Sequence, residues 1–350
     1  MHILLTVRPS RPTIQHTIDT IVIPFHLGGP PVLGWILYRT AESDLKPEMY
    51  EINRFIQESF NENIDLRVIA PEQIDLIVTQ EDRKSILVGG KLEPLPDFVL
   101  PRMGAGTTYF ALAVIRHLER LGVPCFNAAA NIDTVKDKLY TQQILAESNL
   151  PVPKTMLARF PVNAELIEKK IGFPAIIKTL SGSQGKGVFL SENRKSLEDL
   201  MQLIEATSPK ANIILQEFIS DSYGRDLRVF TIGGRAVVCM ERTAPQDSFK
   251  ANFSAGGSVR EYPLTPEIEW LAVETSRILG LEIAGVDLLF DGDHFKICEV
   301  NSSPGFEGME AATGRNIPAE IFHYLKIRLG IFPSAPEPAA VAPVDPATPN

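Results

Sequence analysis

Two acidic residues and one amide residue near the carboxyl end of the chain have the types and spacing of a metal site. Glu299 and Asn301 are two residues apart in a predicted strand, so both side chains project from one face. If a three-residue loop joins this strand to the preceding one, Asp287 lies directly opposite Glu299. Two carboxylates that close repel unless a proton or a cation lies between them. The set suits Mg²⁺ shared with substrate phosphates; the alternative is a solvated acidic hairpin.

Two lysines are placed to hold an anion. Lys178 interrupts the apolar run 174–180, which we predict to be a buried strand, and lysine is rarely buried without an anionic partner. We expect a phosphate oxygen as that partner; the alternatives are a lysine on an edge strand or an internal ion pair. Lys138 lies in the first turns of a helix that we expect to begin at an N-cap, Asp133.

A glycine-rich loop, residues 181–187, joins two predicted strands. A Walker-type phosphate loop needs a different glycine spacing before a helix, whereas Gly182 and Gly185 are too close together and Lys186 is followed by glycine. The dinucleotide-binding fingerprint fails as well. We interpret the loop as a lid whose backbone amides and Lys186 could close over phosphates; the alternative is a plain surface hairpin.

A third group of polar residues lies on predicted strands between these regions. Asp226 and Arg228 are two residues apart, so they face the same side of a sheet. Arg242 ends the next predicted strand. A loop that we expect to be mobile follows it and carries Lys250 and Asn252.

Alternating strands and helices must position these residues. Near the amino terminus, strands at 35–38, 65–69 and 98–100 and a helix at 48–60 predict parallel βαβ packing. A further helix begins after Thr107 or Thr108 and ends before Gly122. Other predicted elements are a helix at 163–171 and strands at 188–190, 212–219, 226–232, 236–242, 283–290 and 295–301.

Composition excludes several classes of protein. The 350 residues are enough for about two domains, and 44% of them are hydrophobic. The 34 Lys and Arg against 43 Asp and Glu leave a net charge of -9, the wrong sign for binding a nucleic-acid backbone. No run of 18 apolar residues predicts a membrane span, and no signal peptide is visible. We expect a cytoplasmic protein.

The sequence lacks the motifs of disulfide frameworks, zinc sites and serine hydrolases. The three cysteines, Cys125, Cys239 and Cys298, are far apart and odd in number, which argues against disulfides or a structural zinc site. None of the six histidines falls in an HExxH arrangement. No Gly-x-Ser-x-Gly elbow offers a serine nucleophile.

The ordered series of motifs resembles the ATP-grasp superfamily, and more narrowly the RimK-type glutamate ligases. The narrower resemblance lies in Pro101-Arg102-Met103-Gly104, Gly285-Val286-Asp287 and residues 304–308. The superfamily motifs are Asp137-Lys138, Ile177-Lys178-Thr179, residues 181–187, Gln216-Glu217-Phe218-Ile219, Asp226-Leu227-Arg228, Asp287 and residues 299–305.

The resemblance implies an α/β (α+β) chain, an ATP-grasp fold preceded by a small doubly wound, Rossmann-like pre-ATP-grasp domain. Residues 1–34 have no counterpart in a typical member, and Lys250-Ala251 stands where RimK-type ligases often carry Arg-Ser, which affects the acceptor site. We divide the chain into an extension (1–34), the pre-ATP-grasp domain (35–127), a first subdomain with the lid (128–215), a second with the metal site (216–332) and a disordered Pro/Ala tail (333–350).

The resemblance also implies the cofactors and the site residues. The cofactors are ATP and two Mg²⁺ ions, for which Mn²⁺ could substitute. Metal ligands would be Asp287, Glu299 and Asn301, and groups that meet the phosphoryl or acyl group would be Arg228, Arg242, Lys250 and Asn252. Nucleotide contacts would be Lys138, Lys178, Ser181, Gly182, Gln184, Gly185, Gly187, Gln216, Glu217, Phe218, Ile219 and Asp226.

Three hypotheses follow from the resemblance. The first is an ATP-dependent carboxylate–amine ligase that forms an amide through an acyl phosphate, with glutamate favoured and a peptide C-terminus or small acid as acceptor. The second is an ATP-binding regulatory module without turnover. The third is a related ligase with a different amino acid, as in glutathione-like synthesis. Related ligases imply a homo-oligomer, a dimer or a tetramer; we expect no nucleic-acid or membrane partner.

Overall fold

The computed structural model describes residues 30–80, 86–179, 187–208, 210–245, 249 and 256–332. The chain divides into two compact units, residues 1–31 and 32–350, and only Pro30 and Pro31 of the first are described. The predicted tail, 333–350, lies outside the described residues. Within the described ranges, no helix is long and apolar enough to cross a membrane.

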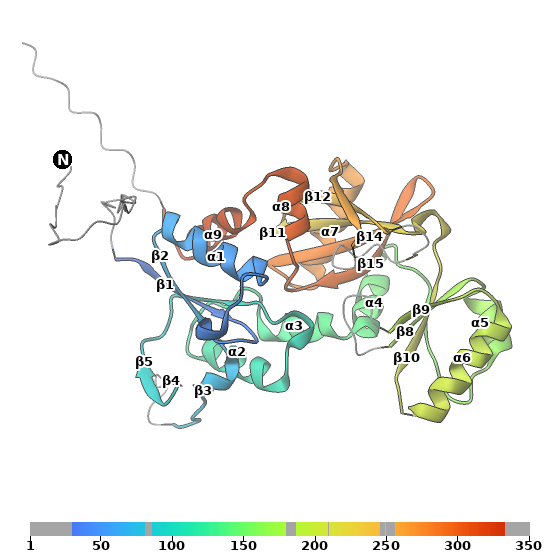
Figure 1. The fold of residues 1–350 in the computed structure, drawn as a ribbon, viewed down its shortest axis with the longest axis horizontal. Helices are drawn as coiled ribbons and strands as arrows, with labels where there is room; N and C mark the ends of the chain where they lie inside the picture. Colours follow the sequence, from blue (N-terminus) through green and yellow to red (C-terminus); the bar gives the residue numbers. More distant parts are fainter. Residues whose placement is uncertain are drawn as a thin grey trace, which may run out of the picture. The chain divides into compact units, whose positions relative to one another are not determined.

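The sheet nearest the amino terminus has three parallel strands in the order β2-β1-β6. Figure 1 labels β1 and β2. Strand β1 begins at Val32 rather than at Trp35. Along β1, Ile36 packs in the core that contains α1, and Trp35 in the core that contains α2, so helices cover both faces. The predicted doubly wound βαβ arrangement is confirmed. Its elements are β1 Val32–Leu37, α1 Tyr50–Asn61, β2 Ile64–Ile69, β6 Phe98–Pro101 and α2 Tyr109–Arg120.

A small antiparallel sheet, β3-β4-β5, lies between β2 and β6 in the chain and was not predicted. Its strands are short, so the pattern of alternating residues is too brief to mark them. Gly89 and Gly90 form the turn between β4 and β5 with φ of 58° and 74°, which glycine adopts without strain. The bounds are β3 Ile74–Asp75, β4 Ile86–Val88 and β5 Lys91–Glu93.

Two helices, α3 (Ala129–Lys136) and α4 (Lys138–Glu147), replace the single helix expected from Asp133. The prediction that Asp133 is the N-cap is wrong, because Asp133 lies inside α3. The N-cap is Asp137, whose extended backbone separates the helices and whose carboxylate accepts hydrogen bonds from the backbone amides of residues 139 and 140. Lys138 is therefore the first residue of α4.

A four-stranded antiparallel sheet in the order β7-β10-β8-β9 carries Lys178 and Gln216. Helices α5 and α6 lie beside this sheet (Figure 1). Ile167 of α5 and Leu197 of α6 pack in one core with Ile177 of β8. The elements are β7 Thr155–Leu157, α5 Ala164–Lys170, β8 Ala175–Thr179, β9 Val188–Ser191, α6 Arg194–Thr207 and β10 Ile213–Glu217.

The five-stranded antiparallel sheet, in the order β13-β12-β11-β14-β15, carries the acidic residues. Helix α7 packs on one face through residues such as Leu271. At one end of the other face, Phe230 packs with Phe306 and Phe322, whereas the other end is charged. The elements are β11 Arg225–Ile232, β12 Arg235–Thr243, β13 Ser258–Glu261, α7 Pro266–Ile278, β14 Ile283–Asp291, β15 His294–Asn301, α8 Glu307–Thr313 and α9 Ile317–Arg328, with 3-10 turns at Glu42–Asp44, Pro71–Gln73, Gly104–Gly106 and Ser220–Ser222.

Candidate active site

Asp287 and Glu299 are paired across β14 and β15, as predicted. The connection is not a three-residue loop, because residues 291 and 294 pair and leave a two-residue turn. That turn alone would place Asp287 opposite Cys298. A β-bulge after Asp287 shifts the register by one residue and brings Glu299 into that position.

Two arginines and two aspartates form a ladder across this face of the sheet. Arg228 binds both oxygens of Asp287, each at 2.7 Å. Arg242 binds both oxygens of Asp226, also at 2.7 Å, and reaches Asp287 Oδ2 at 2.9 Å. Asp226 and Arg228 therefore face the same side of β11, as their spacing predicted. Such bidentate pairs hold both guanidinium planes in one orientation.

The pKa values of the two aspartates of the ladder are shifted in opposite directions. Burial raises the pKa of Asp226 above its ordinary value, in spite of the Arg242 guanidinium beside it. Burial acts in the same sense on Asp287, but Arg228 and Arg242 outweigh it and hold the pKa of that carboxyl below its ordinary range. Asp287 is thus anionic at neutral pH.

Glu299 faces a cation from a different element. Lys138 donates to Glu299 Oε1 at 2.6 Å, and the Lys138 side chain is about one-fifth exposed. Because Asp137 caps α4 just before it, Lys138 starts that helix beside the carboxyl end of β15. The free backbone amides and the positive end of a helix dipole also favour an anion at such a position.

Lys178 extends from β8 toward the same strand. Its Nζ donates to Gln216 Oε1 at 2.7 Å and lies 3.7 Å from Cys298 Sγ, while Gln216 Nε2 donates to Thr155 Oγ1. The edge-strand alternative is wrong, because β8 lies between β10 and β9. Among the described residues Lys178 forms no ion pair with a carboxylate; its hydrogen-bond partners there are Gln216 and Cys298.

A pocket lies where these groups meet. Besides its apolar residues, three lining residues were not predicted from the sequence, namely Thr141, Gln142 and Cys298. The first two follow Lys138 by three and four residues, which is the spacing of one helix face. This spacing could have predicted Gln142 from the sequence. Cys298 is the residue of β15 that the bulge leaves without a paired residue on β14. The pocket is lined by Val135, Lys138, Thr141, Gln142, Lys178, Ile214, Gln216, Cys298, Glu299 and Val300.

Residues outside the sheet fix the loop that follows Asn301. Arg102, at the end of β6, donates to Pro304 O at 2.6 Å, and its guanidinium lies over the rings of Phe55 and Phe306. Burial lowers the pKa of Arg102 to about 10. Fully buried Asn127 donates to the carbonyls of residues 283 and 302 at 2.7 and 2.8 Å. The amino-terminal domain thus holds this loop directly.

The predicted metal ligands fit a hard cation in donor type. In the described part of the chain no cluster of three or more His, Cys, Asp or Glu forms a metal site; the set here is two carboxylates and one amide. Arg228 takes one lone pair of Asp287 Oδ1, and a carboxylate oxygen has two. Asn301 Nδ2 is buried and has no hydrogen-bond partner among the described residues, so no bond fixes that amide against turning its oxygen toward a cation.

The predicted nucleotide contacts at and after the end of β10 are held in place. Glu217 Oε2 accepts from the backbone amide of Lys154 and from Lys296 Nζ, and the Phe218 ring meets Tyr223 edge-on. Ile219 is buried. Gly187 has a φ of 78° and an added Cβ there would collide with Thr179, so only glycine fits. Predicted site residues that lie outside the described residues are Ser181, Gly182, Gln184, Gly185, Lys250 and Asn252.

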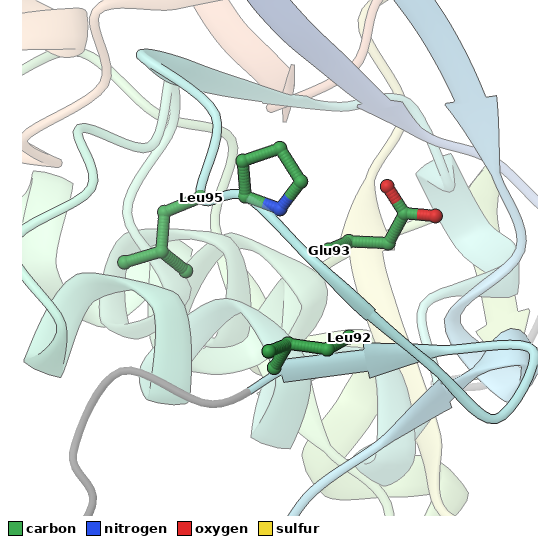
Figure 2. Close-up of a pocket in the computed structure, with 4 residues that line it drawn as sticks. Leu92, Glu93 and Leu95 are labelled. Atoms are coloured by element: carbon green, nitrogen blue, oxygen red, sulfur yellow. The ribbon is translucent and has the colours of Figure 1, made fainter.

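A second pocket is lined by four consecutive residues of one segment. Figure 2 shows Leu92, Glu93 and Leu95 projecting from β5 and the segment after it; with Pro94 they line this pocket. Its one ionisable side chain, Glu93, is paired with Arg67 at 2.9 Å. Four consecutive, mostly apolar residues offer no convergent polar groups, so the candidate site is the pocket beside Glu299.

Comparisons with known proteins match both halves of the chain. Residues 135–325 match the RimK-like ATP-grasp domain and residues 44–132 the RimK PreATP-grasp domain. The chain is 36% identical to a probable alpha-L-glutamate ligase 1 of Shewanella amazonensis, over 82% of this chain and 95% of the relative. It is 36% identical to a probable alpha-L-glutamate ligase of Legionella pneumophila, over 80% and 92%.

A solved structure shares the fold. It is the ATP-grasp ligase PsnB in complex with a phosphomimetic variant of a minimal precursor, Mg and ADP. The TM-score is 0.65 and the sequence identity 16%, over 86% of this chain and 99% of PsnB. At that identity the likeness concerns the fold.

Proposed function

Because the chain belongs to the RimK-like ATP-grasp family of ATP-dependent, ADP-forming ligases, we propose that it joins a carboxylate to the amine of an amino acid through an acyl phosphate. The expected fold class, an ATP-grasp fold preceded by a pre-ATP-grasp domain, is confirmed. ATP and Mg²⁺ are the cofactors that the family and its solved relative support. Two metal ions, and Mn²⁺ as a substitute, belong to the proposal.

One observation carries the proposal: Lys138 and Lys178, from two different elements, converge in a single pocket beside Glu299, which is paired with Asp287. A chain with a net charge of -9 repels an anionic triphosphate on average. The two lysine amines place positive charge at the pocket, where it can attract the phosphates. The paired carboxylates supply the oxygens that Mg²⁺ prefers. No nucleophilic side chain is required, because positioning and charge neutralisation carry phosphoryl transfer.

The proposed reaction has two steps. In the first, a carboxylate oxygen of the acceptor attacks the γ-phosphorus of ATP, the bond to the β,γ-bridging oxygen breaks, and ADP leaves. In the second, the amine nitrogen attacks the carbonyl carbon, the carbon–oxygen bond to phosphate breaks, and the amine loses a proton. Amide, ADP and inorganic phosphate are the products.

We assign roles to residues as follows. Lys138 and Lys178 hold the phosphates and the lid around Gly187 covers them. Arg228 and Arg242 meet the transferred phosphoryl group or the acyl phosphate, with each guanidinium held in its orientation by its aspartate partner. Mg²⁺, held by Asp287, Glu299 and Asn301, would neutralise phosphate charge. The remaining assignments are Gln216, Glu217, Phe218 and Ile219 beside adenine, Asp226 at the ribose, and Lys250 and Asn252 at the acceptor.

Glutamate is the proposed amino acid, supported by relatives named as probable alpha-L-glutamate ligases. A peptide C-terminus or a small acid is the proposed acceptor, supported by a fold relative solved with its precursor. The test is ADP release with Mg²⁺, glutamate and a panel of carboxylates, followed by mass analysis of the product. A product heavier by one glutamyl residue is expected. A different added mass assigns another amino acid. If none of the carboxylates in the panel leads to ADP release, the ligase reaction is contradicted.

The proposal extends to assembly and location. We propose a homo-oligomer, a dimer or a tetramer, in the cytoplasm, where the free cysteines Cys125, Cys239 and Cys298 would stay reduced. Light scattering at several protein concentrations tests the assembly. A monomer at every concentration contradicts it.

A further inference from the structure

Gln142 is a buried amide in the candidate pocket that uses only its donor half. The residue as a whole is 6% exposed, and it lines the pocket together with Lys138 and Lys178. Its Nε2 donates to Cys298 O at 3.0 Å and to Ile297 O at 3.4 Å. Within the described ranges, Oε1 has no hydrogen-bond partner. A buried acceptor without a donor is unfavourable, so this atom marks a point where a ligand can complete the pocket.

The orientation of this amide is determined by its surroundings. The oxygen and nitrogen of a glutamine are distinguished by the hydrogen bonds they make. Turning Gln142 over would aim Oε1 at the carbonyl oxygens of Ile297 and Cys298, which are acceptors too. Oε1 therefore stays on the side away from β15, held by the strand that carries Glu299.

The ligand group that meets Oε1 has to be a hydrogen-bond donor. At neutral pH the ionised phosphate oxygens of ATP accept hydrogen bonds, so the donors are the amino group of adenine and the two ribose hydroxyls. The pocket that Gln142 lines also has apolar walls, Val135, Ile214 and Val300. Such walls suit the flat faces of a base better than a ribose, whose hydroxyls need polar partners.

We propose that Gln142 Oε1 accepts a hydrogen bond from the exocyclic amino group of adenine and makes the pocket select ATP over GTP. Guanine carries a carbonyl oxygen at the corresponding ring position, and two acceptors facing each other repel. The inference rests on the proposed function, since it takes ATP as the nucleotide bound beside Lys138 and Lys178. It makes Gln142 a specificity-determining residue, one helical turn after Lys138.

Nucleotide binding to the full chain tests the inference without requiring turnover. The probe is purine riboside triphosphate, which lacks the amino group but is otherwise ATP. Calorimetry gives the Kd of both nucleotides for the wild type, for Gln142→Met, and for Gln143→Met at the exposed neighbouring position. Methionine keeps the side-chain volume and removes the acceptor. If Gln142→Met also loosens β15, the binding of both nucleotides weakens equally. Such an effect cancels in the ratio of the two Kd values.

The expected result is a preference for ATP over the analogue that is about tenfold smaller in Gln142→Met than in the wild type and unchanged in Gln143→Met. An unchanged ratio in Gln142→Met overturns the inference. So does a loss of discrimination against 2′-deoxy- or 3′-deoxy-ATP instead, which would assign Oε1 to a ribose hydroxyl. Wild type that binds ATP yet releases no ADP contradicts the ligase function alone, whereas wild type that binds no nucleotide contradicts both.

Discussion

Asp287 and Glu299 are paired across two strands, yet each carboxylate is bound to a different cation. Arg228, from the same sheet, holds Asp287 at 2.7 Å, and Lys138, from α4, holds Glu299 at 2.6 Å. The protein's own cations therefore relieve the repulsion between the two carboxylates. A metal ion at this pair would share Asp287 with Arg228 and would compete with Lys138 for Glu299 Oε1.

Asp287→Asn tests that arrangement. Asparagine keeps the size of the side chain but removes one negative charge and one of the oxygens, so Mg²⁺ loses a hard anionic ligand. We expect the rate of ADP release to fall about 100-fold and half-saturation to require more Mg²⁺. The measurement is ADP release against Mg²⁺ concentration. Asp293→Asn, in the exposed turn of the same hairpin, should match the wild type. Wild-type Mg²⁺ dependence in Asp287→Asn would exclude this carboxylate as a ligand.

Lys138→Met tests the anion-binding role of the first residue of α4. Removing a charged donor to phosphate should raise the Kd for ATP about 10- to 100-fold. The loss should shrink as the salt concentration rises, because salt screens the charge that the wild type uses. Calorimetry at two ionic strengths measures it. Lys195→Met removes an exposed lysine of α6 as the control. A Kd equal to that of the wild type would remove Lys138 from the nucleotide site.

The alternation of apolar and polar residues was enough to predict the sheets that carry Lys178, Asp226 and Glu299. It predicted the pairing of Asp287 with Glu299 through the wrong connection, because a bulge has no signature in a single sequence. The N-cap was placed at Asp133 rather than at Asp137, since both aspartates precede apolar residues and only packing against the rest of the chain decides between them. Long-range anchors such as that from Arg102 to Pro304 depend on tertiary contacts and are invisible in sequence.

Arg102→Met tests whether the amino-terminal domain positions the loop after Asn301. Methionine fills the space between Phe55 and Phe306 but cannot donate to Pro304 O. The lost hydrogen bond and the relief of a buried charge oppose each other, so we expect the free energy of unfolding to change by less than about 2 kcal/mol. Turnover should fall about 100-fold through misplacement of the loop.

The Kd for ATP separates this positioning role from general damage. Arg102 does not line the candidate pocket beside Glu299, so Arg102→Met should bind ATP as the wild type does. Arg116→Met, on exposed α2 surface, is the matched control for loss of an arginine. A Kd that rises in step with the loss of turnover would indicate a distorted fold instead of a displaced loop.

Tyr50 contributes a pH-dependent term to stability. Its hydroxyl donates to Glu310 Oε2 at 2.7 Å, which joins α1 to α8. Burial and the Glu310 carboxylate raise the pKa of Tyr50 from 10.0 to about 12. The folded state thus holds the proton more tightly than the unfolded state, so this stabilisation is complete below pH 10 and is lost as pH rises toward 12.

Tyr50→Phe should therefore lose less stability than the wild type between about pH 9.5 and pH 11.5. Urea unfolding at both pH values measures the difference. Tyr140→Phe, at a half-exposed position of α4, should show the wild-type loss. Equal losses in wild type and Tyr50→Phe would show that the Tyr50–Glu310 hydrogen bond does not persist in solution.

Cys298 offers a chemical probe of the candidate pocket. Burial raises the pKa of the Cys298 thiol, although the neighbouring Lys178 acts in the opposite sense. The reactive thiolate is therefore scarcer at pH 7 than in a free thiol, and alkylation by iodoacetamide should be slow there and accelerate about tenfold per pH unit. Cys125 and Cys239 are buried outside the pocket, and burial raises the pKa of both, so they should react only after denaturation.

Bound ATP should slow alkylation of Cys298 about tenfold, because this side chain lines the same pocket as Lys138 and Lys178. Peptide mapping by mass spectrometry, with and without ATP, follows each cysteine separately. Cys298→Ser should abolish labelling of the native protein, since the other two thiols are buried. Labelling of Cys298 at the same rate with and without saturating ATP would place the nucleotide elsewhere on the chain.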